Sequence, residues 1–348
     1  MQNDINTARF DCSFASANTS GGFVSYFPMI FDERKLDTLI VLKGGPGSGK
    51  STLMRAFASR AQKKGYKVRA ILCSSDPSSI DGVIIPELSI AMLDGTAPHI
   101  YDPGITGAVG RIFDLARFLD RKALNASKDK IIALGDEKSL HYRRALEYLS
   151  CAGKLSRLEG EALDFDYGKA SAFLRALIAG ESQTTEATVN FLPYSSYGMN
   201  GLCSLDPFPN ADKTVYVKQF HGSERILLDT AAKEALRAGI SVTVSPDPLV
   251  PETPAALIFP ALNIRIVSEC AENSAVRASS FASLPKDKDE RAAAAKLASS
   301  RWQLISGAND EFALMKKAHF ALEEIYSSAM DFVTKESAQE ALIDELLN

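Results

Sequence analysis

The sequence predicts an α/β fold with two similar halves, each containing a three-layer unit with a parallel sheet and each extended by helices. Two observations support this prediction. A glycine-rich loop near residue 45 joins an apolar, strand-like run to an amphipathic, helix-like run, and a weakened copy of the pattern returns near residue 220. Runs of strand and helix character alternate around both loops, as in parallel sheets covered by helices.

Composition and charge are those of an ordinary globular chain. The 348 residues exceed the roughly 100–200 typical of one domain, so we expect two domains. With 46% hydrophobic and 24% charged residues, the chain has enough apolar side chains for buried cores. The net charge of −4 leaves no basic excess, so the sequence carries no strong signal for nucleic-acid binding.

Nothing in the sequence indicates a membrane or an oxidising compartment. Residues 1–9 lack the charged and then apolar order of a signal peptide, and no run reaches the ~18 apolar residues of a membrane span. The five cysteines are scattered without C-x-x-C spacing, which favours reduced thiols. We therefore expect a cytoplasmic protein.

The first half begins with a strand, a loop and a helix. Asp37–Lys43 is an apolar run typical of a buried parallel strand, and Ser51–Lys64 has helical spacing of apolar residues and ends at Gly65. Lys67–Cys73 and Ser89–Leu93 are two further strand-like runs, the latter followed by Asp94. This order predicts an α/β unit with the loop at the carboxyl ends of its strands.

Long helical periods follow the strands. They extend over Ile105–Arg121, Lys138–Leu158 and a C-terminal region, Asp287–Leu347, whereas Glu181–Gly198, rich in Thr, Ser, Pro and Tyr, interrupts them. These helical parts are also the places where we expect a protein partner or a second protomer to dock.

The chain resembles itself. Asp37–Leu53 aligns without a gap with Asp212–Leu228, and Ile85–Ile90 returns, with small gaps, as Phe259–Ile264. A shorter repeat is found in the helical parts, where residues 143–145 are similar to residues 316–318. In the loop, four residues recur: Lys43, Gly47, Ser48 and Leu53 as Lys218, Gly222, Ser223 and Leu228. We infer a tandem duplication with a boundary near 165, so that residues 1–165 and 166–348 form the two domains.

The first loop has the pattern G-x-x-x-x-G-K-[ST], which indicates a phosphate-binding P-loop when it lies between a strand and a helix. Glycines let backbone N–H groups converge on phosphate oxygens, and the helix N-terminus adds its positive end. Lys50 is expected to reach the β- and γ-phosphates, Ser51 to bind Mg²⁺, and Thr52 to support the α-phosphate. The predicted nucleotide-binding set is Gly44, Gly45, Pro46, Gly47, Ser48, Gly49, Lys50, Ser51 and Thr52. The alternative is a glycine turn that only connects strand to helix.

Asp94 is the predicted carboxylate on the metal side. It ends an apolar strand at the edge of the sheet where the loop lies, a pattern that places a carboxylate near Mg²⁺, usually through water. The alternative is that Asp94 caps the turn that starts Asp94-Gly95-Thr96. The predicted metal ligands are therefore Ser51 and Asp94.

Three more residues are candidates for the chemistry. Asp76 follows the second strand, where it could activate an acceptor, but Asp-Pro also opens turns, and the same two interpretations apply to Asp81. His99 lies five residues after Asp94, near enough to contact a substrate or an attacking water, although a loop histidine is commonly a packing residue. The candidate catalytic set is Lys50, Asp94, Asp76 and His99.

These motifs together resemble a known group of proteins. The segments 43–52, 73–77, 81–88 and 93–99 are similar to those of an uncharacterised family of bacterial tandem P-loop ATPases, in the P-loop NTPase superfamily. The resemblance is dense over residues 14–103 and thin afterwards. It implies ATP binding, a cytoplasmic setting and a P-loop NTPase-type fold, and it implies no particular substrate.

In the family that the chain resembles, both halves can carry a P-loop, but the second loop is broken here. Gln219-Phe220-His221 replaces two glycines and a proline, Glu224 replaces Gly49, and Ile226 replaces the hydroxyl of Ser51. Bulky side chains, a repulsive carboxylate and a missing Mg²⁺ ligand predict that this loop does not bind nucleotide. The second half is then either a regulatory or partner-docking domain or a half kept for packing.

The sequence leaves three functions open. The leading one is an ATPase that uses Mg²⁺ and whose nucleotide state drives a change in the helical parts or in a partner. The alternatives are a small-molecule or nucleotide kinase and a nucleotide-gated binding module with little turnover. The kinase interpretation lacks a recognisable arginine-rich lid, for which only scattered arginines are available: Arg111, Arg117, Arg121, Arg143 and Arg144. ATP is favoured over GTP because the chain has no N-K-x-D tetrapeptide.

Overall fold

The structure is a computed structural model that describes residues 11–178, 187–206, 208, 210–269 and 276–348. The chain forms two compact units. Of the described residues, those within 11–16, 25–143 and 311–348 form unit 1, and those within 17–24 and 144–310 form unit 2. The predicted boundary near 165 concerns the sequence repeats and stays a prediction. Among the described residues, no helix combines the length and apolar character needed to cross a bilayer.

Unit 1 is built on a mixed six-stranded sheet with the order β1-β5-β6-β7-β4-β8. Its strands are β1 (Asp11–Phe14), β4 (Thr38–Lys43), β5 (Arg69–Leu72), β6 (Ile80–Ile85), β7 (Ile90–Asp94) and β8 (Gly110–Asp114). Only β6 runs antiparallel to its neighbours. The expectation of a wholly parallel sheet is therefore wrong at β6, because the connections to β5 and β7 are too short for a crossover.

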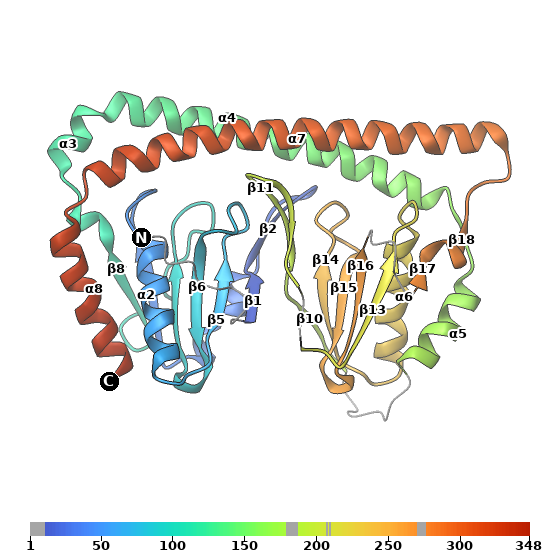
Figure 1. Cartoon of the computed structure of the whole chain (residues 1–348), viewed down its shortest axis with the longest axis horizontal. Coiled ribbons are helices and arrows are strands. Elements are labelled where there is room, and N and C mark those ends of the chain that lie inside the picture. The colour runs from blue at the N-terminus through green and yellow to red at the C-terminus, as the bar shows by residue number, and fades with distance from the viewer. Residues whose placement is uncertain (1–10, 179–186, 207, 209, 270–275) are drawn as a thin grey trace. The chain divides into compact units, whose positions relative to one another are not determined.

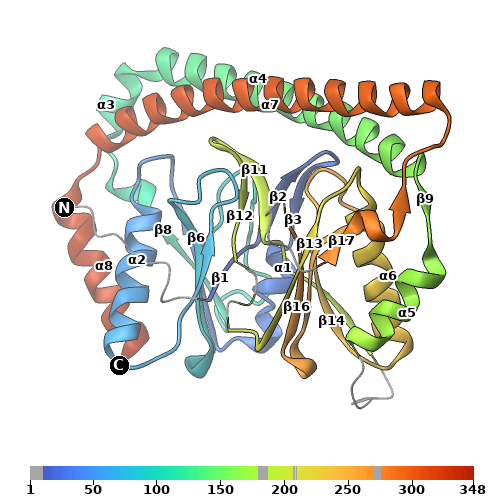
Figure 2. The same ribbon diagram turned by 45° about the vertical axis from the view of Figure 1, so that its right-hand side comes forward.

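Helices cover both faces of this sheet. On one face α2 (Lys50–Lys63) buries Leu53, Met54 and Phe57, and α8 (Phe332–Leu347) lies beside it (Figures 1 and 2). Arg60 of α2 forms ion pairs with Glu340 and Asp344 of α8. On the other face the short α1 (Phe27–Ile30) adds to a second core.

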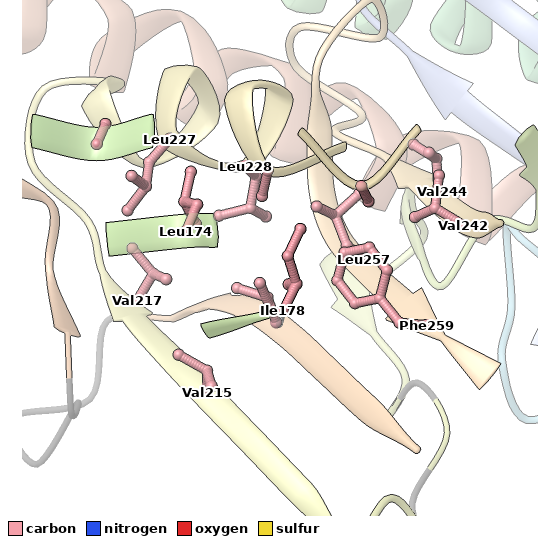
Figure 3. Close-up of a cluster of buried hydrophobic side chains, with 14 of the residues drawn as sticks. Leu174, Ile178, Val215, Val217, Leu227, Leu228, Val242, Val244, Leu257 and Phe259 are labelled. Atoms are coloured by element: carbon pink, nitrogen blue, oxygen red, sulfur yellow. The ribbon is translucent and has the colours of Figure 1, made fainter. Parts of the chain in front are cut away.

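Unit 2 repeats this plan. Its mixed six-stranded sheet has the order β10-β14-β15-β16-β13-β17, and β15 runs antiparallel to both of its neighbours. The strands are β10 (Val189–Phe191), β13 (Lys213–Lys218), β14 (Val242–Pro246), β15 (Pro254–Phe259), β16 (Ile264–Glu269) and β17 (Val276–Arg277). Helices α5 (Tyr167–Leu177) and α6 (Ser223–Arg237) pack against each other and bury Leu174, Leu227 and Leu228 over the sheet (Figure 3).

The two units match strand for strand, which confirms the predicted duplication at the level of topology. Even an unusual turn recurs. The 3₁₀ helices η3 (Pro86–Leu88) and η5 (Pro260–Leu262) end at Ser89 and Asn263, and both of these residues have a φ of 51°. Because non-glycine residues seldom adopt this conformation, its recurrence is a further detail that the two units share.

Two long helices follow the sheets, α4 (Lys128–Glu161) and α7 (Lys288–Ser328), and they pack together. In unit 1 the rings of Tyr142 and Phe312 lie 6.5 Å apart, and in unit 2 Arg301 forms an ion pair with Glu159. The predicted helix over Lys138–Leu158 lies within α4, and the C-terminal helical region is confirmed as α7 and α8.

The helix predicted over Ile105–Arg121 is wrong. This segment contains β8 and the 3₁₀ helix η4 (Leu115–Phe118), and helix α3 (Arg121–Ala126) begins only afterwards. Pairing with β4 from Leu39–Gly110 to Lys43–Asp114 overrides the local helical pattern. Of the predicted interruption Glu181–Gly198, residues 181–186 lie outside the described residues, and the rest contains β10 and β11 (Ser195–Gly198).

Short elements complete the chain. The hairpin of β2 (Ser16–Thr19) and β3 (Gly22–Ser25) has its counterpart in β11 with β12 (Gly201–Ser204). β9 (Asp164–Phe165) pairs with β18 (Ala282–Ser283), and the 3₁₀ helices η2 (Glu33–Lys35) and η6 (Ala278–Ser280) lie in connections.

Candidate functional site

The glycine-rich loop lies where the sequence predicts it, between the end of β4 and the start of α2. Three of its glycines have positive φ angles, 155° at Gly44, 68° at Gly47 and 87° at Gly49. Side chains with a Cβ atom strongly disfavour these conformations, so the loop depends on glycine at these positions. Gly49 is the N-cap of α2, and its conformation delays the helix until Lys50.

The C-terminal helices of unit 1 pack closely on this loop. A Cβ atom on Gly45 would lie 2.8 Å from the Tyr326 ring, and one on Gly47 would lie 2.5 Å from the carbonyl oxygen of Glu323. A Cβ atom on Gly49 would lie 2.7 Å from Nζ of Lys335. The glycines therefore also make room for α7 and α8.

Lys50 and Ser51 make hydrogen bonds close to the loop. Nζ of Lys50 donates to the carbonyl oxygens of Gly44 at 2.9 Å and Gly45 at 3.0 Å. It also lies 3.6 Å from Oδ2 of Asp94. Oγ of Ser51 accepts a hydrogen bond from the Ile80 N–H at 3.1 Å. The loop, the lysine and the strand-end carboxylate therefore come together.

Asp94 shows features of both of its predicted roles. Oδ1 accepts hydrogen bonds from N–H of Thr96 at 2.9 Å and from its hydroxyl at 2.6 Å, so Asp94 caps the turn after β7. Oδ2 faces Lys50. One oxygen therefore orients the carboxylate, and the other remains directed toward the loop.

A buried cluster of three side chains lies next to Lys50. The ligand atoms of Asp81, Asp94 and His99 all lie within 4.8 Å of one another. Asp81 is 4% exposed and His99 8%, and Nε2 of His99 is 4.0 Å from Oδ2 of Asp81. The His99 ring stacks on Phe27, with centroids 4.6 Å apart. His99 therefore has the packing contact that was the alternative to a functional role, and it also lies beside two carboxylates.

The electrostatics of this cluster centre on Asp81. Burial raises the pKa of Asp81 to about 6, and the Asp94 carboxylate adds to the rise, while His99, Lys50 and the Cys73 thiol oppose it. A carboxyl with a pKa near neutrality is common at functional sites and also occurs in structural networks.

Lys43 holds the segment that carries His99. Its Nζ donates to the carbonyl oxygens of Gly95 and Tyr101, both at 2.9 Å, and lies 2.7 Å from Asp102. Because Lys43 is the last residue of β4, these bonds fix the segment after β7 against the end of β4.

Asp76 lies outside this cluster. Its Oδ1 accepts hydrogen bonds from N–H of Ser78 at 3.1 Å and from the Ser78 hydroxyl at 2.7 Å. These bonds are those of the Asp-Pro turn that was the alternative to a catalytic role. A part for Asp76 in activating an acceptor stays a prediction.

Sequence reasoning missed the contributions of α7 and α8. A hydrogen bond with His319, together with Lys50 and the Gly47 N–H, holds the pKa of the Glu323 carboxyl below its usual value. Lys335 is 2% exposed, and burial lowers its pKa. On α4, Lys138 is close enough to Lys50 and Glu323 for their charges to affect its own pKa, which burial lowers.

One signal for Lys335 was present in the repeats. Asp331 and Asp166 are equivalent N-caps, accepting N–H hydrogen bonds from Thr334 at the start of α8 and from Lys169 at the start of α5. Four residues after each cap, α8 has the buried Lys335 and α5 has the buried Ala170. The lysine therefore appears only beside the intact loop.

The second loop has a different local structure. Helix α6 begins at Ser223, and the N–H of Phe220 donates to Oε2 of Glu224 at 2.9 Å. Arg225, the counterpart of Lys50, donates to the carbonyl oxygen of Ser156 at 3.1 Å, and its Nη1 lies 3.7 Å from Glu224 and 3.9 Å from Asp247. The charge of Arg225 is therefore used within unit 2.

Comparison of the chain with protein-family models, curated proteins and solved structures finds no match.

Proposed function

We propose that this chain binds ATP at the loop of unit 1 and hydrolyses it with Mg²⁺ to drive a conformational or regulatory change. The observation that carries the proposal is the arrangement of the loop. Its glycine-dependent backbone leads directly into α2, Lys50 and Ser51 occupy the first turn of that helix, and Asp94 lies beside Lys50 at the end of the adjacent strand.

The residues of the loop fit a nucleotide with Mg²⁺. Residues 44–49 have the backbone freedom that a phosphate cradle needs, and the first turn of α2 contains no acidic residue that would repel phosphate. Lys50 would neutralise the β- and γ-phosphates, and the Ser51 hydroxyl would be a metal ligand, with Asp94 on the metal side. Mg²⁺ would supply neutralisation of charge that develops on the phosphate oxygens.

The proposed change involves α7 and α8, because they lie on the loop. The Gly47 N–H, a donor that a phosphate oxygen would use, lies close enough to the Glu323 carboxyl to help lower its pKa. Tyr326 and Lys335 lie against Gly45 and Gly49. Nucleotide and Glu323 would therefore compete for the same donor, so that nucleotide binding favours a displaced α7.

The test is the fate of ATP incubated with the purified chain, Mg²⁺ and a pool of nucleosides and small metabolites. We expect release of inorganic phosphate that depends on Mg²⁺ and is lost in Lys50→Ala. Lys63→Ala, an exposed lysine at the other end of α2, is the matched control and should behave as the parent chain. Consumption of an acceptor would instead indicate a kinase, and tight binding without turnover would indicate a nucleotide-gated module.

A further inference from the structure

We propose that Asp81, Asp94 and His99 form a binding site for a divalent transition-metal ion, which the chain binds in the absence of nucleotide. This site shares Asp94 with the Mg²⁺ position assigned above but differs from it, because the Mg²⁺ position also requires Ser51 and nucleotide phosphates. The proposal therefore does not depend on ATP binding.

The spacing of the three side chains suits one ion. Metal–ligand bonds from histidine and carboxylate are ~2.0–2.2 Å long, so ligand atoms on opposite sides of an ion lie ~4.2 Å apart. His99 Nε2 and Asp81 Oδ2 are 4.0 Å apart, and the three ligand atoms lie within 4.8 Å of one another. Movements of about half an ångström would bring all three to bonding distance.

The environment of the Asp81 carboxylate indicates that it binds a cation. It is 4% exposed, and its Oδ2 has no hydrogen-bond partner in the part of the chain that the structure describes. This oxygen is the one that faces His99. A buried carboxylate oxygen normally accepts a hydrogen bond or binds a metal ion. Transfer of the carboxylate from water to the protein interior costs free energy unless a new partner replaces the lost water. A metal ion between Asp81 and His99 would supply the missing partner.

The side chains are also held in position. Thr96 binds Oδ1 of Asp94 and leaves Oδ2 directed at Lys50, and the His99 ring stacks on Phe27. Asp81 comes from β6, Asp94 from the end of β7 and His99 from the following segment, which Lys43 fixes to β4. Ligands on such a framework need little reorganisation to bind an ion.

The donor types select the kind of metal. Two carboxylates and one imidazole offer a mixture of oxygen and nitrogen ligands. Imidazole is a good ligand for transition metals, whereas Mg²⁺ and Ca²⁺ favour oxygen ligands only. With Lys50 nearby, two carboxylates and one ammonium leave a net negative charge when His99 is neutral. The site therefore suits Mn²⁺ or Zn²⁺ better than Mg²⁺.

Unit 2 shows that the fold does not require these carboxylates. In the equivalent strands, the register places Ala255 at the position of Asp81 and Ser268 at the position of Asp94. The same hairpin forms with neither acid. The hairpin of unit 1 therefore places two acidic groups close together without needing them for its fold, which favours a ligand-binding role over a structural one.

The experiment is titration of the full-length, chelator-treated chain with Mn²⁺, without nucleotide, followed by calorimetry and by electron paramagnetic resonance of bound Mn²⁺. We expect one ion per chain, displaced by Zn²⁺, with at least tenfold weaker binding of Mg²⁺. Asp81→Asn and His99→Gln should each weaken Mn²⁺ binding at least tenfold. One control should leave it unchanged: Glu87→Gln, which neutralises a carboxylate at the other end of the sheet.

Pulsed resonance on the parent chain gives a readout that needs no substitution, because an imidazole ligand couples a nitrogen nucleus to bound Mn²⁺. Circular dichroism identifies any variant that does not fold. In that case the pulsed resonance spectrum of the parent chain decides whether an imidazole binds the metal ion. Absence of stoichiometric binding of Mn²⁺ and Zn²⁺, absence of nitrogen coupling, or full affinity in folded Asp81→Asn and His99→Gln would overturn the proposal. Metal binding without ATP binding would support the metal site and contradict the proposed function.

Discussion

The two loops of this chain start from the same strand register and reach different structures. In unit 1 the residues 44–49 separate β4 from α2, which begins at Lys50. In unit 2 α6 begins at Ser223, which aligns with Ser48, so the helix starts two residues earlier. The residue aligned with Gly49 is Glu224, which is helical. One glycine, Gly49, therefore distinguishes the open loop of unit 1 from the helix of unit 2 that begins two residues earlier, because its positive φ postpones the start of α2.

Both loops also meet a carboxylate, but its origin differs. In unit 2 Glu224 belongs to the loop itself and accepts the Phe220 N–H. In unit 1 Glu323 comes from α7, far along the sequence, and the Gly47 N–H helps to lower the pKa of its carboxyl. A carboxylate within the loop cannot leave it, whereas one on a separate helix can be displaced. We therefore expect an anion to replace the carboxylate in unit 1 and not in unit 2.

The largest expected effect comes from the two equivalent cations. Lys50→Ala should weaken ATP binding about 100-fold, which corresponds to about 2.7 kcal/mol, because the ammonium pairs with phosphate charge. Arg225→Ala should leave ATP affinity unchanged, because Arg225 is engaged within unit 2. Calorimetry on folded variants measures both. An equal loss in the two variants would show that the loops are not functionally different.

A smaller effect is expected at the strand ends, where Asp94 is equivalent to Ser268. Asp94→Asn should lower Mg²⁺-dependent turnover about 30-fold and change metal-free nucleotide binding less than about threefold, because the amide keeps the acceptor for Thr96 but loses the charge. Steady-state rates measure the turnover, and thermal unfolding measures the stability of the variant. Loss of thermal stability with unchanged turnover per folded molecule would assign Asp94 to the turn alone.

Much of this comparison was predictable from the sequence, because it is local. The loop, its flanking strand and helix, and the substitutions at Gln219–His221 and Glu224 follow from glycine conformation and short-range periodicity. The antiparallel β6, the strand β8 and the contacts of Glu323 and Lys335 were not predictable. They depend on which distant segments pack together, and no local pattern encodes that choice.

Lys335 allows a test of whether α8 contributes to the site, since its equivalent in unit 2 is Ala170. Lys335→Met should weaken ATP binding about tenfold by removing a cation beside Gly49. Because burial lowers the pKa of Lys335, the charged amine opposes folding below that pKa. The variant should therefore be more stable than the parent at pH 7, and the gain should vanish as pH rises past the amine's ordinary pKa. A variant with unchanged ATP affinity would restrict Lys335 to packing.

The smallest expected effect is at Glu323, and it is an increase in ATP affinity rather than a loss. Glu323→Gln should tighten ATP binding about threefold, since the neutral amide competes less well for the Gly47 N–H and no longer repels phosphate. Glu324→Gln, the neighbouring acid on the same helix, is the control. Weaker binding in Glu323→Gln would mean that this carboxylate supports the nucleotide rather than competing with it.

We propose that only one of the two structurally equivalent units binds nucleotide. The most direct measurement is the stoichiometry of a non-hydrolysable ATP analogue, in the presence of Mg²⁺, bound to the full-length chain in titration calorimetry. The account predicts one site per chain, abolished by Lys50→Ala and unaffected by Arg225→Ala. Two sites of comparable affinity, or a single site lost in folded Arg225→Ala and kept in Lys50→Ala, would contradict it.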